Sequence, residues 1–193
     1  MCILGYRNER YRSQQVCHNN KEYTLKKHGF TLIELMVVIV IMGILAAVAV
    51  PKLFGMIAKS KASEVPTAAG SYINMQDAFA LERNSLGGWT EIGYSAPGAK
   101  AHASSYASEN FVYTGAAITN GGSASTQVTI ADAWKATGKV KLDDCAIGGW
   151  WSFTIKNGTS NQQGNVGYEA KTSSAVCEGL APAFKKLNHA LGS

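Results

Sequence analysis

Residues 26–50 read KKHGFTLIELMVVIVIMGILAAVAV, and they contain the longest apolar run of the chain. From Leu35 to Val50 the sequence holds sixteen residues without a charge, and Glu34 is the only charged residue between Phe30 and Val50. As an α-helix, residues 30–50 span roughly 31 Å, the hydrocarbon thickness of a bilayer. Because a helix that is apolar on every face is rare in a soluble protein, we interpret residues 30–50 as a membrane span. A deeply buried core helix is the alternative.

The residues on either side of this run indicate its orientation. Lys26 and Lys27 precede the run, so the positive-inside rule leaves that end in the cytoplasm and translocates the C-terminal part. A secretory signal would have a shorter apolar core followed by a small-residue cleavage site. Instead Pro51 follows, and the helical pattern continues with charged residues. We therefore expect the apolar segment to be retained.

Glu34 is the exceptional residue of this segment. A carboxylate inside a membrane helix costs about 2.5–3.5 kcal/mol on insertion scales, with a smaller cost near a helix end. Glu34 is therefore either tolerated near the membrane surface or paired with a cation in the same apolar layer. The next seventeen residues contain no Lys or Arg. Within this chain the candidate partner is a new N-terminal amine, which a cut just before Phe30 would create.

The order of residues from Lys26 to Leu35 resembles the class III signal and N-terminal methylation motif of type IV pilins and related pseudopilins. In that family a membrane-embedded aspartyl peptidase cuts after the glycine and methylates the new amino terminus. The resemblance implies cleavage between Gly29 and Phe30, with Phe30 as the N-methylated first residue. It also implies that Glu34 neutralises the amino terminus of a neighbouring subunit during fibre assembly.

The same resemblance makes residues 1–29 a cleaved leader, which is long for this style of motif. A start near Leu25 from a non-AUG codon would give a conventional short leader. Gly43 and Pro51 match a glycine and a proline that bracket a helical segment able to melt in the fibre. Glycine weakens a helix by about 1 kcal/mol, and proline removes a backbone donor. Alternatively, Gly43 serves close packing in a small-xxx-small pair with Ala47.

Past Pro51 the pattern predicts that the helix continues to residue 84, as an amphipathic half that packs on a globular head. Pro66 should bend it, and Gly87-Gly88 should end it. The expected apolar stripe consists of Val65, Ala68, Ala69, Tyr72, Ile73, Met75 and Phe79. The expected polar face consists of Lys61, Glu64, Thr67, Ser71, Asn74 and Asp77.

Residues 85–193 are expected to form the head. The Gly-, Ala- and Ser-rich composition of residues 85–125 indicates a long surface loop. Period-two alternation predicts short strands at residues 111–113, 126–130, 151–155 and 166–170, with a polar hairpin loop at 157–165. The expected fold class is α+β: a long N-terminal helix packed on a small antiparallel sheet, similar to type IV pilins.

Four cysteines divide between the leader and the head. Cys2 and Cys17 lie in the leader, whereas Cys145 and Cys177 remain in a translocated domain, where an even pair predicts a disulfide. Two free buried thiols are the alternative.

The sequence has no catalytic motif of the serine hydrolase, nucleotide-binding or zinc protease type, and we expect no enzyme activity, cofactor or metal. His102 and His189 are isolated and are expected at the surface. Asp143 and Asp144 could contribute to a calcium-binding site, but two acids alone are weak evidence for one. An exposed pair among Trp89, Trp134, Trp150 and Trp151 would suit sugar rings, but core positions are favoured. The net charge of +5 is concentrated in the leader, so the remaining chain has no electrostatic signal for nucleic acid.

The sequence therefore predicts a type IV pilin subunit that serves adhesion, twitching motility or DNA uptake. The expected partners are copies of itself, a prepilin peptidase, the inner-membrane assembly machinery and the membrane, with any surface or DNA ligand unknown. The expected location is the bacterial inner membrane before assembly and the extracellular pilus afterwards. A pseudopilin of a type II secretion system is the closest alternative. A membrane-anchored enzyme or carbohydrate-binding domain is the second.

Overall fold

The computed structural model describes residues 29–118, 128–157 and 165–189, which form parts of two compact units, residues 1–44 and 45–193. The leader up to His28, the first two residues of the predicted strand at 126–130, and most of the predicted 157–165 loop lie outside the described residues.

Two helices follow each other at the start of the described chain: α1, Leu32–Ala62, and α2, Glu64–Arg83. The helical assignment is interrupted at Ser63, three residues before Pro66. Proline lacks the N–H that would bond the carbonyl of Ala62 and its ring crowds that carbonyl, which accounts for the break. Asn84 ends α2 in the left-handed conformation, with its N–H donating to the Ala80 carbonyl. The predicted stop before Gly87-Gly88 therefore agrees with the observed end.

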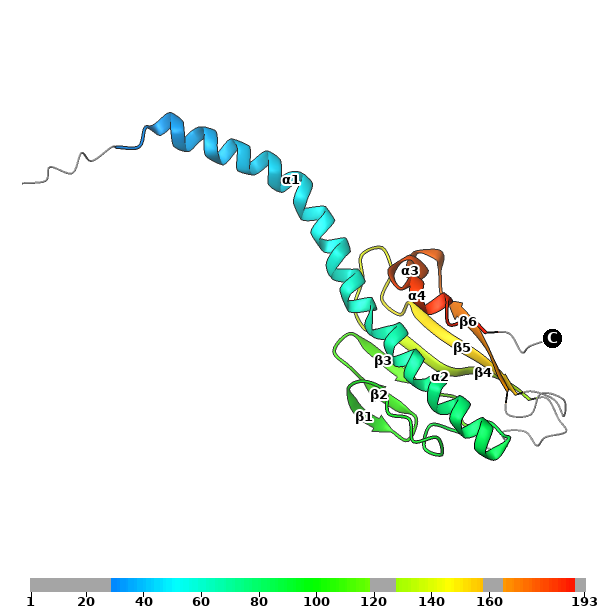
Figure 1. Ribbon diagram of the computed structural model, residues 1–193. Coiled ribbons are helices and arrows are strands. Elements are labelled where there is room, and N and C mark those ends of the chain that lie inside the picture. Colours follow the sequence, from blue (N-terminus) through cyan, green and yellow to red (C-terminus); the bar gives the residue numbers. More distant parts are fainter. Residues whose placement is uncertain (1–28, 119–127, 158–164, 190–193) are drawn as a thin grey trace, which may run out of the picture. The chain divides into compact units, whose positions relative to one another are not determined.

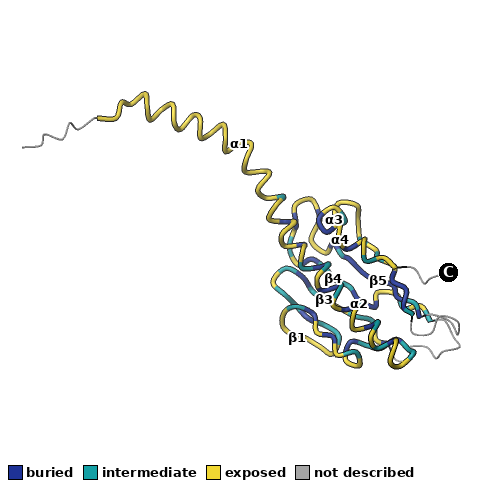
Figure 2. Tube along the Cα trace, in the orientation of Figure 1, coloured by how far each residue is buried: buried dark blue, intermediate teal, exposed yellow. Residues whose placement is uncertain are grey.

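The N-terminal part of α1 is uncovered. Every residue from Gly29 to Phe54 is exposed, as Figure 2 shows by the unbroken yellow trace. The helix is continuous through Gly43 and Pro51 in the isolated chain. The predicted melting of this segment in a fibre therefore stays a prediction.

The second unit contains a six-stranded antiparallel sheet in the order β1-β2-β3-β4-β5-β6, so each strand pairs with its neighbour in sequence (Figure 1). The strands are β1 Ala99–His102, β2 Ser105–Ala107, β3 Phe111–Thr114, β4 Thr129–Gly138, β5 Trp150–Asn157 and β6 Val166–Thr172. The short helices α3, Ala175–Leu180, and α4, Pro182–Lys185, follow β6. The predicted α+β class, a long helix followed by an antiparallel sheet, is confirmed.

One loop prediction and one strand prediction were wrong in extent. The stretch at residues 85–125 is not one long loop, because it also contains β1 and β2. These strands consist largely of Ala, Ser and Lys, which carry little strand signal of their own. The strand predicted at 126–130 instead begins at Thr129 and continues to Gly138, with a bulge where Asp132 takes a φ of 48°.

The buried face of α2 differs from the predicted stripe at one turn. Met75 is 40% exposed, whereas Gln76 is fully buried. With its amide oriented to satisfy both atoms, the Gln76 side chain donates to the Gly87 carbonyl and accepts from the Gly87 N–H, each at 2.9 Å. Gln76 is buried because it binds the backbone of the turn after α2, which spacing of apolar residues does not reveal.

Two acids predicted on the solvent face of α2 instead hold the helix to the sheet. The Tyr113 hydroxyl donates to Glu64 Oε1 at 2.7 Å, and the Tyr168 hydroxyl donates to Asp77 Oδ1 at 2.6 Å. Burial raises the pKa of Asp77, although the hydrogen bond from Tyr168 and the charge of His189 act in the opposite direction. Both carboxylates are half-buried rather than fully solvated.

Aromatic rings fill the core between α2, the sheet and α4. Trp89, Trp134 and Trp151 are at most 1% exposed, so the preference for core tryptophans is correct for these three. The Trp134 indole N–H donates to the Tyr94 hydroxyl at 2.9 Å, and that hydroxyl donates to the Ala68 carbonyl at 3.0 Å. Burial raises the pKa of Tyr94 to about 12. This chain of bonds links α2, the following loop and β4.

Candidate processing and assembly site

The first turn of α1 is formed by the residues of the predicted processing site. Phe30 and Thr31 precede the helix, which begins at Leu32. The Glu34 N–H donates to Thr31 Oγ1 at 3.3 Å and to the Thr31 carbonyl at 3.1 Å. Thr31 is therefore the N-cap of α1, because its side chain satisfies one of the free donors of the first turn.

Glu34 lies at the third helical position and is exposed. A carboxylate in the first turn is favoured by the helix dipole, by about 0.3–1 kcal/mol. The order Thr31-Leu32-Ile33-Glu34 is the signature of a capping box, so the sequence itself could have identified Thr31 as the cap. Glu34 forms no ion pair with any described residue. Its charge is available to a partner outside the chain.

Gly29 and Gly43 have open surroundings in the isolated chain. A Cβ built at either position meets no atom within 4 Å. Sensitivity to Gly29→Ala would therefore arise in the peptidase rather than in this fold. Packing of Gly43 with small residues would likewise involve another helix.

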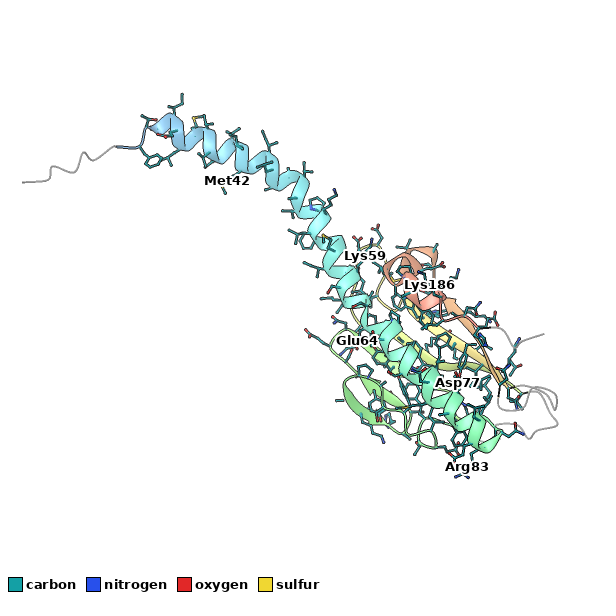
Figure 3. All side chains as sticks on the ribbon, viewed as in Figure 1. Met42, Lys59, Glu64, Asp77, Arg83 and Lys186 are labelled. Carbon is teal, nitrogen blue, oxygen red and sulfur yellow. A yellow bond between two sulfur atoms is a disulfide. The ribbon has the colours of Figure 1, made fainter. Side chains whose placement is uncertain are left out.

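The helical stretch from Leu32 onward is long and apolar enough to cross a membrane. Its most apolar window of 18 residues has a mean hydropathy of 2.9, and none of that window is buried. Figure 3 shows Met42 on this apolar part and Lys59 where charged side chains have returned. The apolar surface exceeds what an isolated soluble protein exposes, so it requires lipid or other protein around it.

The head is closed by a disulfide between Cys145 and Cys177, which confirms the predicted pair. The two Cα atoms are 4.9 Å apart. Cys145 lies in the loop between β4 and β5, and Cys177 lies in α3. Ser174 is the N-cap of α3, and its Oγ accepts from the backbone N–H of Cys177 at 3.3 Å. A Cβ at Gly149 would contact both sulfur atoms, so the bond passes over a position that has room for glycine alone.

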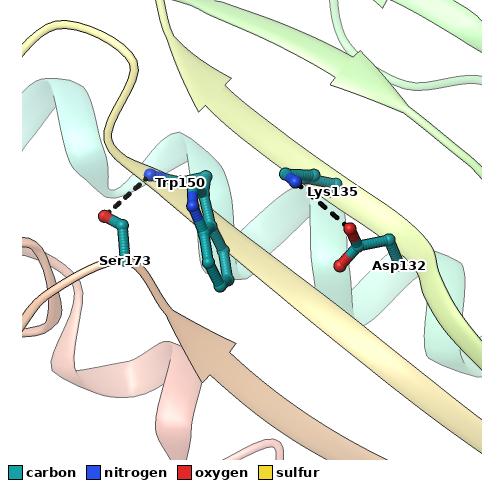
Figure 4. A network of polar contacts seen from close by, with 4 residues as sticks. All are labelled: Asp132, Lys135, Trp150 and Ser173. Atoms are coloured by element: carbon teal, nitrogen blue, oxygen red, sulfur yellow. Dashed lines mark hydrogen bonds and ion pairs between the residues drawn. The ribbon is translucent and has the colours of Figure 1, made fainter.

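Trp150 is the partly exposed tryptophan. Lys135 Nζ lies 4.8 Å from the centre of the Trp150 ring and forms an ion pair with Asp132 at 3.1 Å (Figure 4). The backbone N–H of Trp150 donates to Ser173 Oγ. Its neighbour Trp151 is buried, so the two do not form an exposed aromatic pair. The sugar-stacking pair considered from the sequence is therefore not formed.

The remaining candidates from the sequence are the isolated histidines and a possible metal site. His102 and His189 are exposed, as expected. Across the described ranges, no group of three or more His, Cys, Asp or Glu residues is placed to hold a metal ion.

Comparison with known proteins gives a family match at this N-terminal site and several similar proteins. Residues 24–50 match the family described as the prokaryotic N-terminal methylation motif. The chain is 41% identical over 71 residues to the type IV major pilin protein PilA of Myxococcus xanthus, covering 36% of this chain and 32% of that protein. It is 42% identical over 66 residues to the type IV major fimbrial protein FimA of Dichelobacter nodosus, covering 32% and 42% respectively.

A secretion protein is also similar. The type II secretion system core protein G of Klebsiella pneumoniae is 37% identical over 91 residues, covering 45% of this chain and 64% of that protein. The matches thus span between 32% and 64% of the length of these three relatives. The methylation motif, the capped apolar helix and the antiparallel sheet thus agree with these similarities, which support the type IV pilin and pseudopilin family.

Proposed function

We propose that this chain is a structural subunit of a type IV pilus. The observation that carries the proposal is the exposed apolar helix that begins directly at a methylation motif. In water this surface would aggregate, whereas a bilayer covers it before assembly and the same segments of other copies cover it in a fibre. The similarity to the Myxococcus pilin and the Dichelobacter fimbrial protein supports a fibre rather than a soluble role.

Processing is the first step of the proposed pathway. A prepilin peptidase cuts between Gly29 and Phe30 and methylates the new amine. The mature subunit then waits in the inner membrane, with the head translocated, until the assembly machinery adds it to an extracellular fibre. The chain itself supplies surfaces for assembly and no catalysis.

Assembly is driven by charge pairing in the apolar layer. Glu34 sits in the first helical turn with no ion-pair partner among the described residues. The terminal amine of Phe30 in a neighbouring copy supplies the opposite charge. In a layer of low dielectric an unpaired charge is costly, so pairing selects the axial position at which both charges are satisfied.

Surface fibres provide the test. Fibres sheared from cells and purified should contain this chain as the main component, and mass spectrometry should show a mature N-terminus at Phe30 with one methyl group. An intact leader on assembled subunits would contradict the processing step. Absence of the chain from surface fibres would contradict the pilus assignment.

A pseudopilin role in type II secretion is the second candidate, because the match to the Klebsiella secretion protein covers 64% of that protein. The two roles predict different defects in cells that lack the chain. Deletion should abolish surface fibres and leave secretion of type II substrates intact for a pilin, and the reverse pattern identifies a pseudopilin. Both outcomes are read in the same deletion strain.

A further inference from the structure

A groove in the second unit lies beside α1 just beyond the apolar segment. Its walls are α1 around residues 54–61 and the turn between β4 and β5, and its volume is about 380 Å³. Phe54 and Ile57 are 63% and 47% exposed and provide an apolar floor. Lys61 and Lys141 line the same groove from opposite elements.

The two lysines have no counter-charge in the described part of the chain. Neither Lys61 nor Lys141 forms an ion pair with a described residue, and both are exposed. Asp143 is the acid that lines the groove, and a Cβ at Gly55 would meet its Oδ2 at 3.4 Å. The groove thus carries a net charge of +1 beside an apolar surface, which is the complement of an anionic amphiphile.

The wall that carries Lys141 is held in place. Leu142 and Cys145 exchange two backbone hydrogen bonds, of 3.1 and 2.9 Å, around the turn that contains Asp143. Cys145 is also tied to α3 by the disulfide. The groove is therefore a preformed feature of the head rather than a gap beside a loose loop.

The near end of the groove, at Phe54, lies at the height of the lipid headgroups. Counting from Val50 at 1.5 Å per residue, residues 54–61 lie roughly 6 to 17 Å further along the helix. The headgroup layer extends about 5–8 Å beyond the hydrocarbon on each side. Lys61 lies beyond that layer, and because side chains of a helix tilt toward its N-terminus, its long side chain can extend back toward the headgroups.

Lysines on this side of the span also need an explanation. Lys52, Lys59 and Lys61 follow the apolar run on the translocated side, where the positive-inside rule disfavours them. Phosphates of anionic lipids offset that cost at close range.

We propose that this groove binds the headgroup of an anionic phospholipid in the leaflet on the translocated side, with phosphate between Lys61 and Lys141 and an acyl chain along Phe54 and Ile57. The bound lipid would hold the unassembled subunit at a defined height in the membrane. This inference rests on the proposed membrane-anchored subunit. Binding is measured on the unassembled chain, so loss of fibres in another variant does not affect it.

The test uses the full chain in detergent, titrated with dioctanoyl-phosphatidylglycerol, with bound lipid counted by native mass spectrometry. Dioctanoyl-phosphatidylcholine and dioctanoyl-phosphatidylethanolamine are the comparison lipids. We expect preferential binding of phosphatidylglycerol, weakened about fivefold by Lys61→Gln and by Lys141→Gln. Lys100→Gln, on the exposed strand β1, removes the same charge elsewhere and should leave binding unchanged.

Asp143→Asn separates the possible headgroups. With an anionic headgroup, removing this carboxylate should strengthen binding, whereas an ethanolamine ammonium would lose a partner and bind more weakly. Equal effects of Lys61→Gln and Lys100→Gln, equal retention of phosphatidylcholine, or weaker binding by Asp143→Asn would each overturn the proposal. So would a loss of fibres in Lys61→Gln with unchanged lipid binding, because it would identify the groove as a subunit contact.

Discussion

The apolar part of α1 leaves its side chains exposed, whereas the head buries its largest side chains. Residues 29–54 are exposed throughout, although most of them are apolar. In the head, by contrast, Trp89, Trp134 and Phe153 are at most 1% exposed, and the rings of Trp134 and Phe153 lie 5.8 Å apart. The head buries its large side chains within the chain, whereas the apolar helix depends on lipid or on other copies to cover it.

This difference separates two kinds of mutational effect. A change in the apolar helix should alter assembly without altering the stability of the head, because every residue from Gly29 to Phe54 is itself exposed. A change in the head should alter the free energy of unfolding first. Substitutions in the two regions can test this separation.

The largest effect is expected from Glu34→Ala. Membrane insertion should remain intact, because a carboxylate in the span is itself a cost. Fibre formation should be lost, since the neighbouring amine keeps a charge without a partner, at a cost of about 3–5 kcal/mol per contact. The measurement compares the amount of chain in sheared fibres and in membranes, in cells where the variant is the only subunit source.

Glu82→Ala is the matched control for that variant. Glu82 is an exposed acid of α2 whose contact with Arg83, at 3.4 Å, is on the surface, so fibres should form normally. Normal fibre yield from Glu34→Ala would contradict the assembly role. A lowered melting temperature of its head would contradict the separation of the two regions.

The second effect is expected from loss of the disulfide. Cys145→Ser opens a loop whose ends are 32 residues apart, which in the loop-entropy model removes about 3.5 kcal/mol of stability. Thermal unfolding of the mature chain should show a clear decrease in melting temperature. The wild-type chain in reductant should match the variant, and an unchanged melting temperature in either sample would rule out a stabilising bond.

A smaller loss is expected from Gly149→Ala. The added methyl group would contact the sulfur atoms of Cys145 and Cys177, the latter at 2.8 Å, and a strained core contact of this kind costs about 1–3 kcal/mol. Denaturant unfolding measures the loss directly. Gly179→Ala in α3 is the control, because a Cβ there meets nothing within 4 Å and should be neutral or slightly stabilising.

The smallest effect is expected from Asp77→Asn and depends on pH. Burial raises the pKa of Asp77, so the folded state favours the protonated carboxyl. The stability contributed by this proton is present below the ordinary pKa and is lost as the pH rises through the folded pKa. Wild type should therefore lose stability relative to Asp77→Asn between about pH 3 and pH 7, by on the order of 1 kcal/mol or less.

Tyr168→Phe provides the comparison for the same contact. It removes the hydroxyl that donates to Asp77 and leaves a half-buried carboxylate without that donor, which should destabilise the head by about 1–3 kcal/mol at neutral pH. A stability difference between wild type and Asp77→Asn that stays constant with pH would show that Asp77 titrates normally.

The head shows why sequence patterns predicted only part of the sheet. Strands β5 and β6 alternate clearly and were found near their observed places. Strands β1 and β2 were missed, because Ala, Lys and Ser do not alternate in hydrophobicity and their pairing is decided by neighbours across the sheet. The extension of β4 past Asp132 was missed for a related reason, since a bulge interrupts the alternation there.

The apolar span at residues 30–50 was predictable from local order, and so was Thr31 as the cap of its first turn. The roles assigned to Gly29, Phe30 and Glu34 come from the resemblance to the pilin motif and stay predictions. The residues of the proposed lipid groove were not predictable from local order, because Lys61 and Lys141 are 80 positions apart and only folding brings them to one groove.

Composition and the order of neighbouring residues are enough to predict the membrane-compatible helix, its capped start and the cysteine pair. Contacts between distant residues account for the rest. They bury Gln76, join Glu64 and Asp77 to the hydroxyls of Tyr113 and Tyr168, and place Gly149 under the disulfide. The physical reason is that a polar side chain is buried where a distant partner satisfies it, and the position of that partner is a property of the fold.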